Sequence, residues 1–123
     1  MKHLLLVFIG GGTGSIVRYL FGKMLNNTFT NFPLGTFAAN ILGSLCIGLI
    51  LGYSLKNNNL SQEYILLLAT GFCGGFTTFS SFAYENHVFL KSGDFVSFLL
   101  YATATFAIGL SAVFGGIYLA KLL

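Results

Sequence analysis

Four long apolar segments, separated by short polar ones, constrain the fold of this chain more than any other feature of its sequence. The segments run from about residue 4 to 24, 32 to 55, 62 to 90 and 95 to 123. The hydrocarbon core of a bilayer is about 30 Å thick, and a helix needs roughly 20 apolar residues to cross it. Each segment is long enough for one crossing. The sequence therefore predicts an all-α membrane protein with four transmembrane helices.

The composition favours a chain that is solvated by lipid. Of the 123 residues, 7% are charged and 55% are hydrophobic, whereas soluble domains carry about 25% charged residues. The connections are rich in Asn or carry K-S-G-D, which is typical of exposed turns. Because they leave no room for a soluble domain, residues 1–123 are predicted to form a single transmembrane domain. The apolar pattern continues past G-G-G-T-G-S in the first segment, which favours a retained span over a cleaved signal peptide.

The few charges are divided evenly across the predicted membrane. If the four spans alternate, the cations on one side are Lys2, Lys56 and Lys121, and those on the other are Arg18, Lys23 and Lys91. The imbalance of Lys and Arg that usually fixes orientation is therefore missing. Two interpretations remain open: a small protein that simply has few charges, or a chain that inserts in both orientations and forms an antiparallel dimer. A scattered net charge of +3 does not predict a nucleic-acid partner.

The sequence lacks the motifs of metal, nucleotide and catalytic sites. Cys46 and Cys73 lie inside predicted spans without C-x-x-C spacing, and we expect them to be small buried side chains. His3 and His87 have no second ligand at zinc spacing. The cluster G-G-G-T-G-S completes neither a dinucleotide fingerprint nor a P-loop. Three acidic residues, two histidines and no nucleophile–base pair predict that the chain is not an enzyme.

Small and polar residues recur at helical spacing along the apolar segments. In lipid, a helix turns this face inward. The second segment carries Thr36, Asn40, Ser44, Gly48 and Gly52, and the fourth carries Ser97, Tyr101, Thr105 and Gly109. The glycines suit close helix contacts. The Asn and the hydroxyls allow two interpretations. They form hydrogen bonds that only hold the bundle together, or they form a polar path for an ion. Arg18 is expected either to snorkel to the interface or to attract anions.

The stretch G-F-C-G-G-F-T-T-F-S-S-F, residues 71–82, predicts a break in the third helix. Its glycines weaken a helix, and its four hydroxyl side chains compete for backbone hydrogen bonds. Backbone freed at membrane depth is tolerated only inside protein or beside a wet cavity. Freed carbonyls suit a cation, whereas hydroxyls, N–H groups and phenylalanine edges suit an anion. Phe79 and Phe82 are also spaced as core residues, but together these features favour a channel or transporter for a small ion.

Three segments resemble the CrcB/Fluc family of fluoride channels: G-G-G-T-G-S-I-V-R-Y (10–19), G-T-F-A-A-N-I-L-G-S (35–44) and the stretch 71–82. The resemblance extends over all four spans in order. It implies a passive channel that exports fluoride across the bacterial inner membrane and so gives fluoride resistance. It also implies a dual-topology antiparallel homodimer with two pores, so that fluoride, membrane lipid and a second copy of the chain are the expected partners.

The resemblance assigns roles to individual residues. It places Asn40, Thr78, Phe79, Ser81, Phe82, Tyr101 and Thr105 in the fluoride pore, and Arg18 and Glu85 at its vestibule. It implies a structural sodium ion at the dimer interface, held by the backbone carbonyls of Gly74 and Thr77. Some members continue the hydroxyl track of the fourth helix with a further serine. This chain has Gly109 there, with Ser111 nearby, so the far end of the track stays open.

Other functions are compatible with four spans. One is a structural or accessory subunit of a heterodimeric membrane channel, since some bacteria pair two related subunits of which one loses pore residues. Asn40, Phe79 and Phe82 are all present, which favours the homodimer. Another is a small multidrug exporter, which requires a carboxylate in its first span. This chain has no Asp or Glu before Glu63, which argues against that class.

Overall fold

The computed structural model describes residues 1–26, 31–57 and 60–123, and within these ranges every regular element is a helix. Three long helices are α1 (Lys2–Leu25), α2 (Leu34–Asn57) and α6 (Phe95–Leu122). The third segment consists of four pieces: α3 (Gln62–Tyr64), η1 (Ile65–Cys73), α4 (Gly74–Phe76) and α5 (Phe79–Ser92). The two predicted Asn-rich connections include residues 27–30 and 58–59, which lie outside the described residues.

Four segments are long and apolar enough to cross a membrane: Lys2–Leu25, Leu34–Lys56, Gln62–Ser92 and Phe95–Leu122. Large apolar side chains such as Phe8, Phe106 and Phe114 are exposed along them. Exposed apolar surface of this extent is unfavourable in water and favourable in lipid. These observations confirm an all-α, multi-pass membrane protein in which one of the four spans is interrupted.

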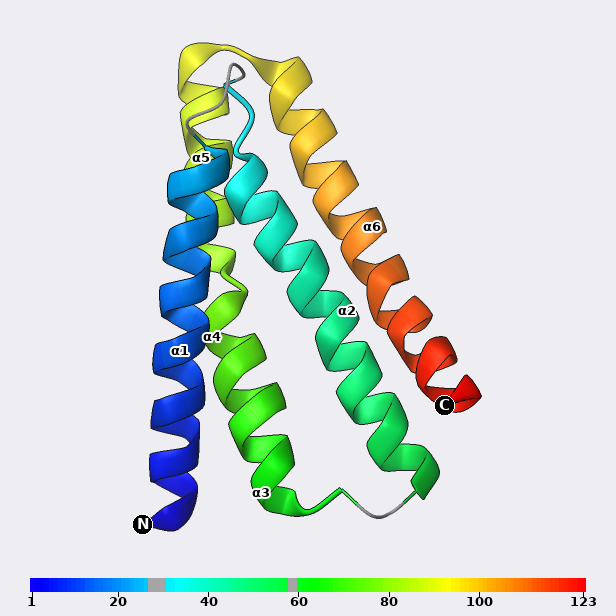
Figure 1. Cartoon of the computed structure of the whole chain (residues 1–123). Coiled ribbons are helices and arrows are strands. Elements are labelled where there is room, and N and C mark those ends of the chain that lie inside the picture. Colours follow the sequence, from blue (N-terminus) through cyan, green and yellow to red (C-terminus); the bar gives the residue numbers. More distant parts are fainter. Residues whose placement is uncertain (27–30, 58–59) are drawn as a thin grey trace.

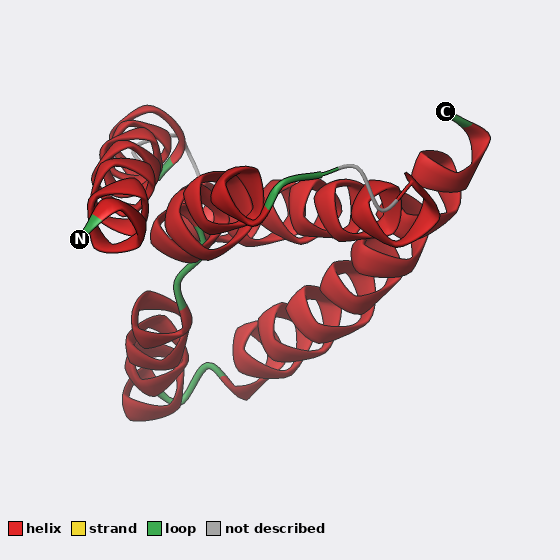
Figure 2. Ribbon diagram, turned by 90° about the horizontal axis from the view of Figure 1, so that it is seen from below, coloured by secondary structure: helices red, strands yellow, loops and turns green. Residues whose placement is uncertain are grey.

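The segments are arranged around α2. On one side α2 contacts α1 and η1, and on the other side it packs along the length of α6 (Figure 1). α1 runs beside η1 and α4. α5 is offset from the first half of its segment and packs against α6, as the view from below shows (Figure 2). Both termini lie at the same end of the molecule (Figure 1), as an even number of crossings requires.

Glycines on α1 allow it to lie against the backbone of the third segment. Gly10 and Gly14 are buried. A Cβ atom on Gly14 would lie 2.8 Å from the Phe76 nitrogen, and one on Gly71 would lie 2.9 Å from the Gly10 Cα. Because the opposing atoms are backbone, no side chain can move aside. Any larger residue at these positions therefore forces the two helices apart.

The glycines at the end of the α2 stripe make a similar contact with α6. A Cβ atom on Gly52 would lie 2.8 Å from the Ile117 Cα, and one on Gly116 of α6 would lie 2.8 Å from the Leu49 nitrogen. The small-residue helix contact predicted for Gly48 and Gly52 is thus confirmed, and its partner is α6.

The third segment is interrupted at Thr77 and Thr78, within the stretch where the sequence predicts a break. Both residues have extended backbone, with φ/ψ of −80°/153° and −150°/118°. Thr78 caps α5, because its Oγ1 accepts a hydrogen bond from the Ser81 nitrogen at 3.3 Å. The break is preceded by a nine-residue π-helix, η1, which the sequence did not predict. The glycines at 71, 74 and 75 remain helical.

The K-S-G-D turn joins α5 to α6. Gly93 ends α5 with a φ of 79°, a left-handed conformation that glycine adopts without strain. Asp94 caps α6, and its Oδ1 accepts a hydrogen bond from the Ser97 nitrogen at 3.1 Å. Hydrogen bonds from the side chain and backbone of Ser97 hold the pKa of this carboxyl below its ordinary value. This tight turn brings Tyr101 and Thr105 of α6 back beside α5.

Candidate ion pathway at the helix break

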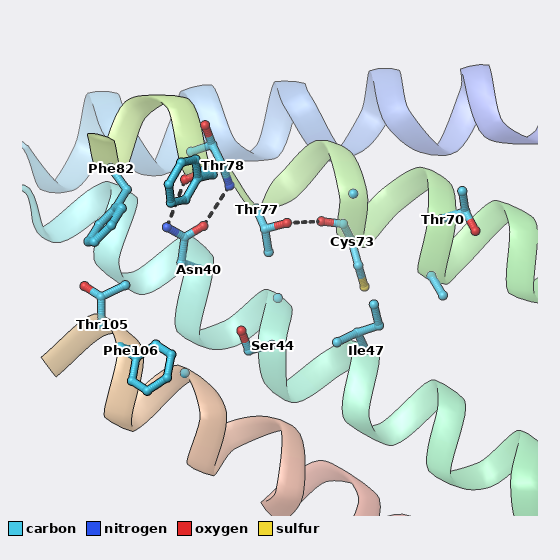
Figure 3. A pocket seen from close by; sticks show the side chains of 15 residues that line it. Asn40, Ser44, Ile47, Thr70, Cys73, Thr77, Thr78, Phe82, Thr105 and Phe106 are labelled. Carbon is cyan, nitrogen blue, oxygen red and sulfur yellow. Dashed lines mark hydrogen bonds between the residues drawn. The ribbon is translucent and has the colours of Figure 1, made fainter. Parts of the chain in front are cut away.

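A cavity of about 510 Å³, here termed the central cavity, lies beside the break between α2, the third segment and α6 (Figure 3). It collects residues from three segments of the chain. Its lining consists of Asn40, Gly43, Ser44, Ile47, Ala69, Thr70, Cys73, Gly74, Thr77, Thr78, Phe79, Phe82, Thr105, Phe106 and Gly109. Five of the seven residues predicted for the pore, and both residues predicted for sodium, therefore border one space. Cys73 is a buried free thiol in its wall, and Cys46 is a half-buried one.

The side chain of Asn40 supplies the hydrogen bonds that Thr78 loses at the break. Its Nδ2 donates to the Thr78 carbonyl at 3.1 Å, and its Oδ1 accepts from the Thr78 N–H at 2.7 Å (Figure 3). A primary amide matches a peptide group in this way because it carries one acceptor and two donor hydrogens. One hydrogen on Nδ2 is left over. Asn40 therefore fixes the break and still has a donor available at the central cavity.

The carbonyls of Gly74 and Thr77 lose their normal helical donors. In an α-helix, each carbonyl accepts from the N–H four residues later. The Thr78 N–H bonds to Asn40 instead of to Gly74, and the Ser81 N–H bonds to the Thr78 hydroxyl instead of to Thr77. These two carbonyl oxygens are therefore freed by the same hydrogen bonds that form the break. They are the two that the resemblance assigns to sodium.

The Gly75 carbonyl points toward α1 and is bonded there. The Nε atom of Arg18 donates to it at 3.0 Å, and the Ser15 hydroxyl reaches it at 3.5 Å. Arg18 thus holds the end of α4 with one edge of its guanidinium. The sequence placed Arg18 at a vestibule and did not predict its bond to the break, which requires the close α1–α4 packing described above.

The two phenylalanines that follow the break differ in exposure. Phe79 is 78% exposed on the rim of the central cavity, whereas Phe82 is half-buried. Their ring centroids are 5.8 Å apart and the rings are tilted by 44°. A ring that few neighbours cover can present its electropositive edge to an anion or to a second subunit.

A second cavity of about 400 Å³, here termed the outer cavity, lies on the other side of the break. Its lining consists of Arg18, Tyr19, Gly22, Lys23, Asn26, Thr36, Thr78, Ser81 and Glu85. Both predicted vestibule residues and the predicted pore residue Ser81 are among them. Thr78 lines both cavities, so the break forms the wall between them.

Glu85 connects three helices beside the outer cavity. Its Oε1 accepts a hydrogen bond from the Thr36 hydroxyl of α2 at 2.5 Å, and its Oε2 accepts one from the Tyr101 hydroxyl of α6 at 2.6 Å. Sequence reasoning did not assign Thr36 to the site. The available signal was its place on the polar stripe, one turn before Asn40.

Tyr101 is fully buried, unlike the other residues predicted for the pore. Its ring centroid lies 5.1 Å from that of Phe32 and 5.2 Å from that of Phe82. It lines neither the central nor the outer cavity, as far as the structure describes the chain. Its hydroxyl reaches the outer cavity through Glu85. The role of each residue in a pore stays a prediction.

A model of the family described as "CrcB-like protein, Camphor Resistance (CrcB)" matches residues 5–117. Curated relatives named "Fluoride-specific ion channel FluC" match nearly the whole chain. The relative from Gloeothece citriformis is 50% identical over 122 residues, covering 98% of both chains. The relative from Chlorobaculum tepidum is 47% identical, covering 99% of this chain and 97% of its own.

The relative from Phocaeicola vulgatus is 45% identical, covering 98% of this chain and 100% of its own. The relatives are named as ion channels, and the prediction that this chain is not an enzyme is confirmed by its kinship with them. The family match includes most of each of the four membrane spans and the break within the third. The chain therefore belongs to the CrcB family, as its three sequence motifs predicted.

Proposed function

We propose that this protein is a passive fluoride channel of the bacterial inner membrane, which lets fluoride leave the cytoplasm and so gives fluoride resistance. The proposal is supported by relatives named as fluoride-specific ion channels over nearly the full length of the chain. The observation that carries it is the Asn40 amide, which holds the broken helix and leaves one donor hydrogen at the central cavity.

The groups around the break suit a small, strongly hydrated anion. A pore for such an ion must replace its water with close donors, just as carbonyls replace water around cations in other filters. The donors available are the free Asn40 hydrogen and the hydroxyls of Ser81 and Thr105, and the edges of Phe79 and Phe82 add partial positive charge. In acidic surroundings, fluoride enters the cell as neutral HF, and the HF dissociates inside. A passive path driven by the membrane potential then removes the fluoride without ATP or a coupled ion gradient.

The active unit is proposed to be an antiparallel dimer of two copies of this chain, with two pores. If the four spans alternate, three cations lie toward each side of the membrane, and such a balance would leave the chain free to insert in both orientations. At the break, Gly74 is exposed, and so is Phe79. A second subunit that crosses at this point would cover both residues and close the central cavity.

A structural sodium ion at the dimer centre fits the chemistry of the break. Hard cations take oxygen ligands, and the freed carbonyls of Gly74 and Thr77 are two such ligands from one subunit. Among the described residues, no cluster of three His, Cys, Asp or Glu side chains could hold a metal ion, and the proposed site rests on backbone oxygens. The ion would supply fixed positive charge beside the pores and would not itself be transported.

Purified chain reconstituted alone into liposomes tests the proposed function. With a potassium ionophore to balance charge, a fluoride electrode is expected to record rapid efflux, while matched vesicles loaded with chloride release none. Equal efflux of both ions would contradict a fluoride channel. If this chain alone gives no fluoride efflux, but efflux appears after co-expression with a related subunit, the chain would instead be an accessory subunit of a heterodimeric channel.

Sodium is expected to copurify with the dimer at about one ion for every two chains, because two antiparallel breaks would share one site. Atomic emission of protein exchanged into sodium-free buffer measures this ratio. Where the ion is removed, fluoride efflux is expected to fall roughly tenfold, the effect of a loss of about 1.4 kcal/mol in anion stabilisation. Protein that copurifies without sodium and still conducts at the normal rate would contradict the proposed sodium site.

A further inference from the structure

Three of the hydroxyl side chains that line the central cavity have no hydrogen-bond partner in the described chain. Ser and Thr in apolar helices normally donate to a carbonyl of their own helix. Thr13 does so to Ile9 at 2.9 Å, and Ser111 does so to Ala107 at 2.7 Å. Ser44 on α2, Thr70 on η1 and Thr105 on α6 make no hydrogen bond within the described chain. Thr70 is exposed, whereas Ser44 is half-buried and the Thr105 Oγ1 is buried. The hydroxyls of Ser44 and Thr105 are therefore left free to bond to something inside the cavity that they line.

Ser44 of α2 lies beside Gly109, a residue of α6 that has no side chain. Gly109 follows Thr105 by one turn of α6 and also lines the central cavity. A Cβ atom on Gly109 would lie 3.7 Å from the Ser44 Oγ and 3.7 Å from the Ile41 Cδ1. These are ordinary van der Waals distances. The hydroxyl of Ser44 therefore occupies the space beside the position where a hydroxyl side chain at 109 would begin.

Ser44 also continues the donors of α2. It lies one turn beyond Asn40, on the same wall of the central cavity, with Thr105 on the facing helix (Figure 3). The cavity thus presents a free amide hydrogen from Asn40 and free hydroxyls from Ser44 and Thr105. An anion that leaves Asn40 along this wall toward Ser44 meets one further free hydroxyl.

We propose that Ser44 is a further anion-binding residue of the fluoride pathway, and that the row of hydroxyls passes from Thr105 on α6 to Ser44 on α2. This inference rests on the proposed function. It assigns the far end of the row to α2 rather than to Ser111. The Ser111 side chain is exposed and bonded to its own helix, and it lines neither the central nor the outer cavity of the described chain.

The test compares fluoride efflux from liposomes carrying wild type, Ser44→Ala, Ser44→Thr and Ser111→Ala. Ser44→Ala is expected to slow efflux about tenfold, the scale of one hydrogen bond to a charged ion. It is also expected to raise the fluoride concentration that gives the half-maximal rate. Ser44→Thr keeps the hydroxyl and is expected to stay near the wild-type rate, and so is the matched control Ser111→Ala.

Moving the hydroxyl from position 44 to position 109 distinguishes a role of Ser44 in ion binding from a role in packing. Gly109→Ser adds a hydroxyl where a Cβ atom has room, so the double variant Ser44→Ala/Gly109→Ser is expected to recover most of the lost rate. Ser44→Cys retains the shape of the side chain with a weaker donor, and it is expected to conduct slowly while melting at the wild-type temperature.

The outcomes distinguish this inference from the proposed function. Wild-type vesicles that release no fluoride would overturn the proposed function, and this inference with it. Wild-type vesicles that conduct, together with Ser44→Ala and Ser44→Cys vesicles that conduct equally well, would overturn the role of Ser44 alone. Failure of Gly109→Ser to rescue a folded Ser44→Ala protein would also count against it.

Discussion

Replacement of Asn40 by alanine is expected to reduce fluoride efflux about 100-fold or more. The substitution leaves both the N–H and the carbonyl of Thr78 unpaired at membrane depth, where each unpaired group costs about 1–3 kcal/mol. It also removes the free amide hydrogen from the central cavity. A loss of about 2.7 kcal/mol corresponds to a factor of 100 in rate or affinity. Electrode recordings from reconstituted liposomes measure the effect.

Two further variants show whether this loss is specific. Asn40→Asp retains an acceptor for the Thr78 N–H, but it loses the donor to the Thr78 carbonyl and adds negative charge, so it is expected to be as inactive as Asn40→Ala. Asn86→Ala is the control, because the Asn86 amide donates to the Phe82 carbonyl of its own helix at 2.9 Å. A folded Asn40→Ala protein with normal fluoride efflux would refute the proposed role of this amide.

Gly14→Ala is expected to destabilise the protein by about 1–3 kcal/mol, the usual cost of overpacking a close contact. The new Cβ atom would lie 2.8 Å from the Phe76 nitrogen and 3.0 Å from the Phe72 carbonyl carbon. Both are backbone atoms, so α1 must move away from α4. This movement would also stretch the Arg18 bond to the Gly75 carbonyl. Thermal unfolding in detergent, followed by size-exclusion chromatography, measures the loss.

The matched control lies two residues away on the same helix. A Cβ atom on Gly12 has no neighbour within 4 Å, and Gly12 is exposed. Alanine is a better helix former than glycine by about 1 kcal/mol, so Gly12→Ala is expected to melt at or above the wild-type temperature. Equal melting temperatures for Gly12→Ala and Gly14→Ala would show that the tight α1–α4 contact does not contribute to stability.

The helical architecture was predictable because each span is long, apolar and bounded by polar turns. The exact place of the break was less so. The glycines at 71, 74 and 75 predict a weak helix, yet they remain helical, and Gly71 and Gly75 pack directly against the α1 backbone. The chain leaves the helix only at Thr77 and Thr78, where Asn40 offers replacement hydrogen bonds. Tertiary contacts of this kind override local propensity and have no signature in the sequence around the break.

The candidate site, like the fold, was only partly predictable from the sequence. Helical spacing placed Thr36, Asn40 and Ser44 on one face of α2, and that face does border the cavities. Spacing alone did not reveal that Thr36 bonds to Glu85 or that Ser44 has no helical partner. Tyr101 is similar, since a buried ring that reaches the outer cavity only through Glu85 looks the same in sequence as one that lines a pore. Such distinctions depend on which helices face each other.

The position of the two termini at one end of the bundle (Figure 1) limits how a gene for this protein can evolve by duplication. If two copies were fused by a short linker, the end of the first and the start of the second would stay on the same side of the membrane. The fused halves would then be parallel. An antiparallel fusion needs a linker that crosses the bilayer, which requires an extra helix of roughly 20 apolar residues. Separate copies of a four-span chain would avoid this requirement in the proposed antiparallel dimer, because each copy could orient independently.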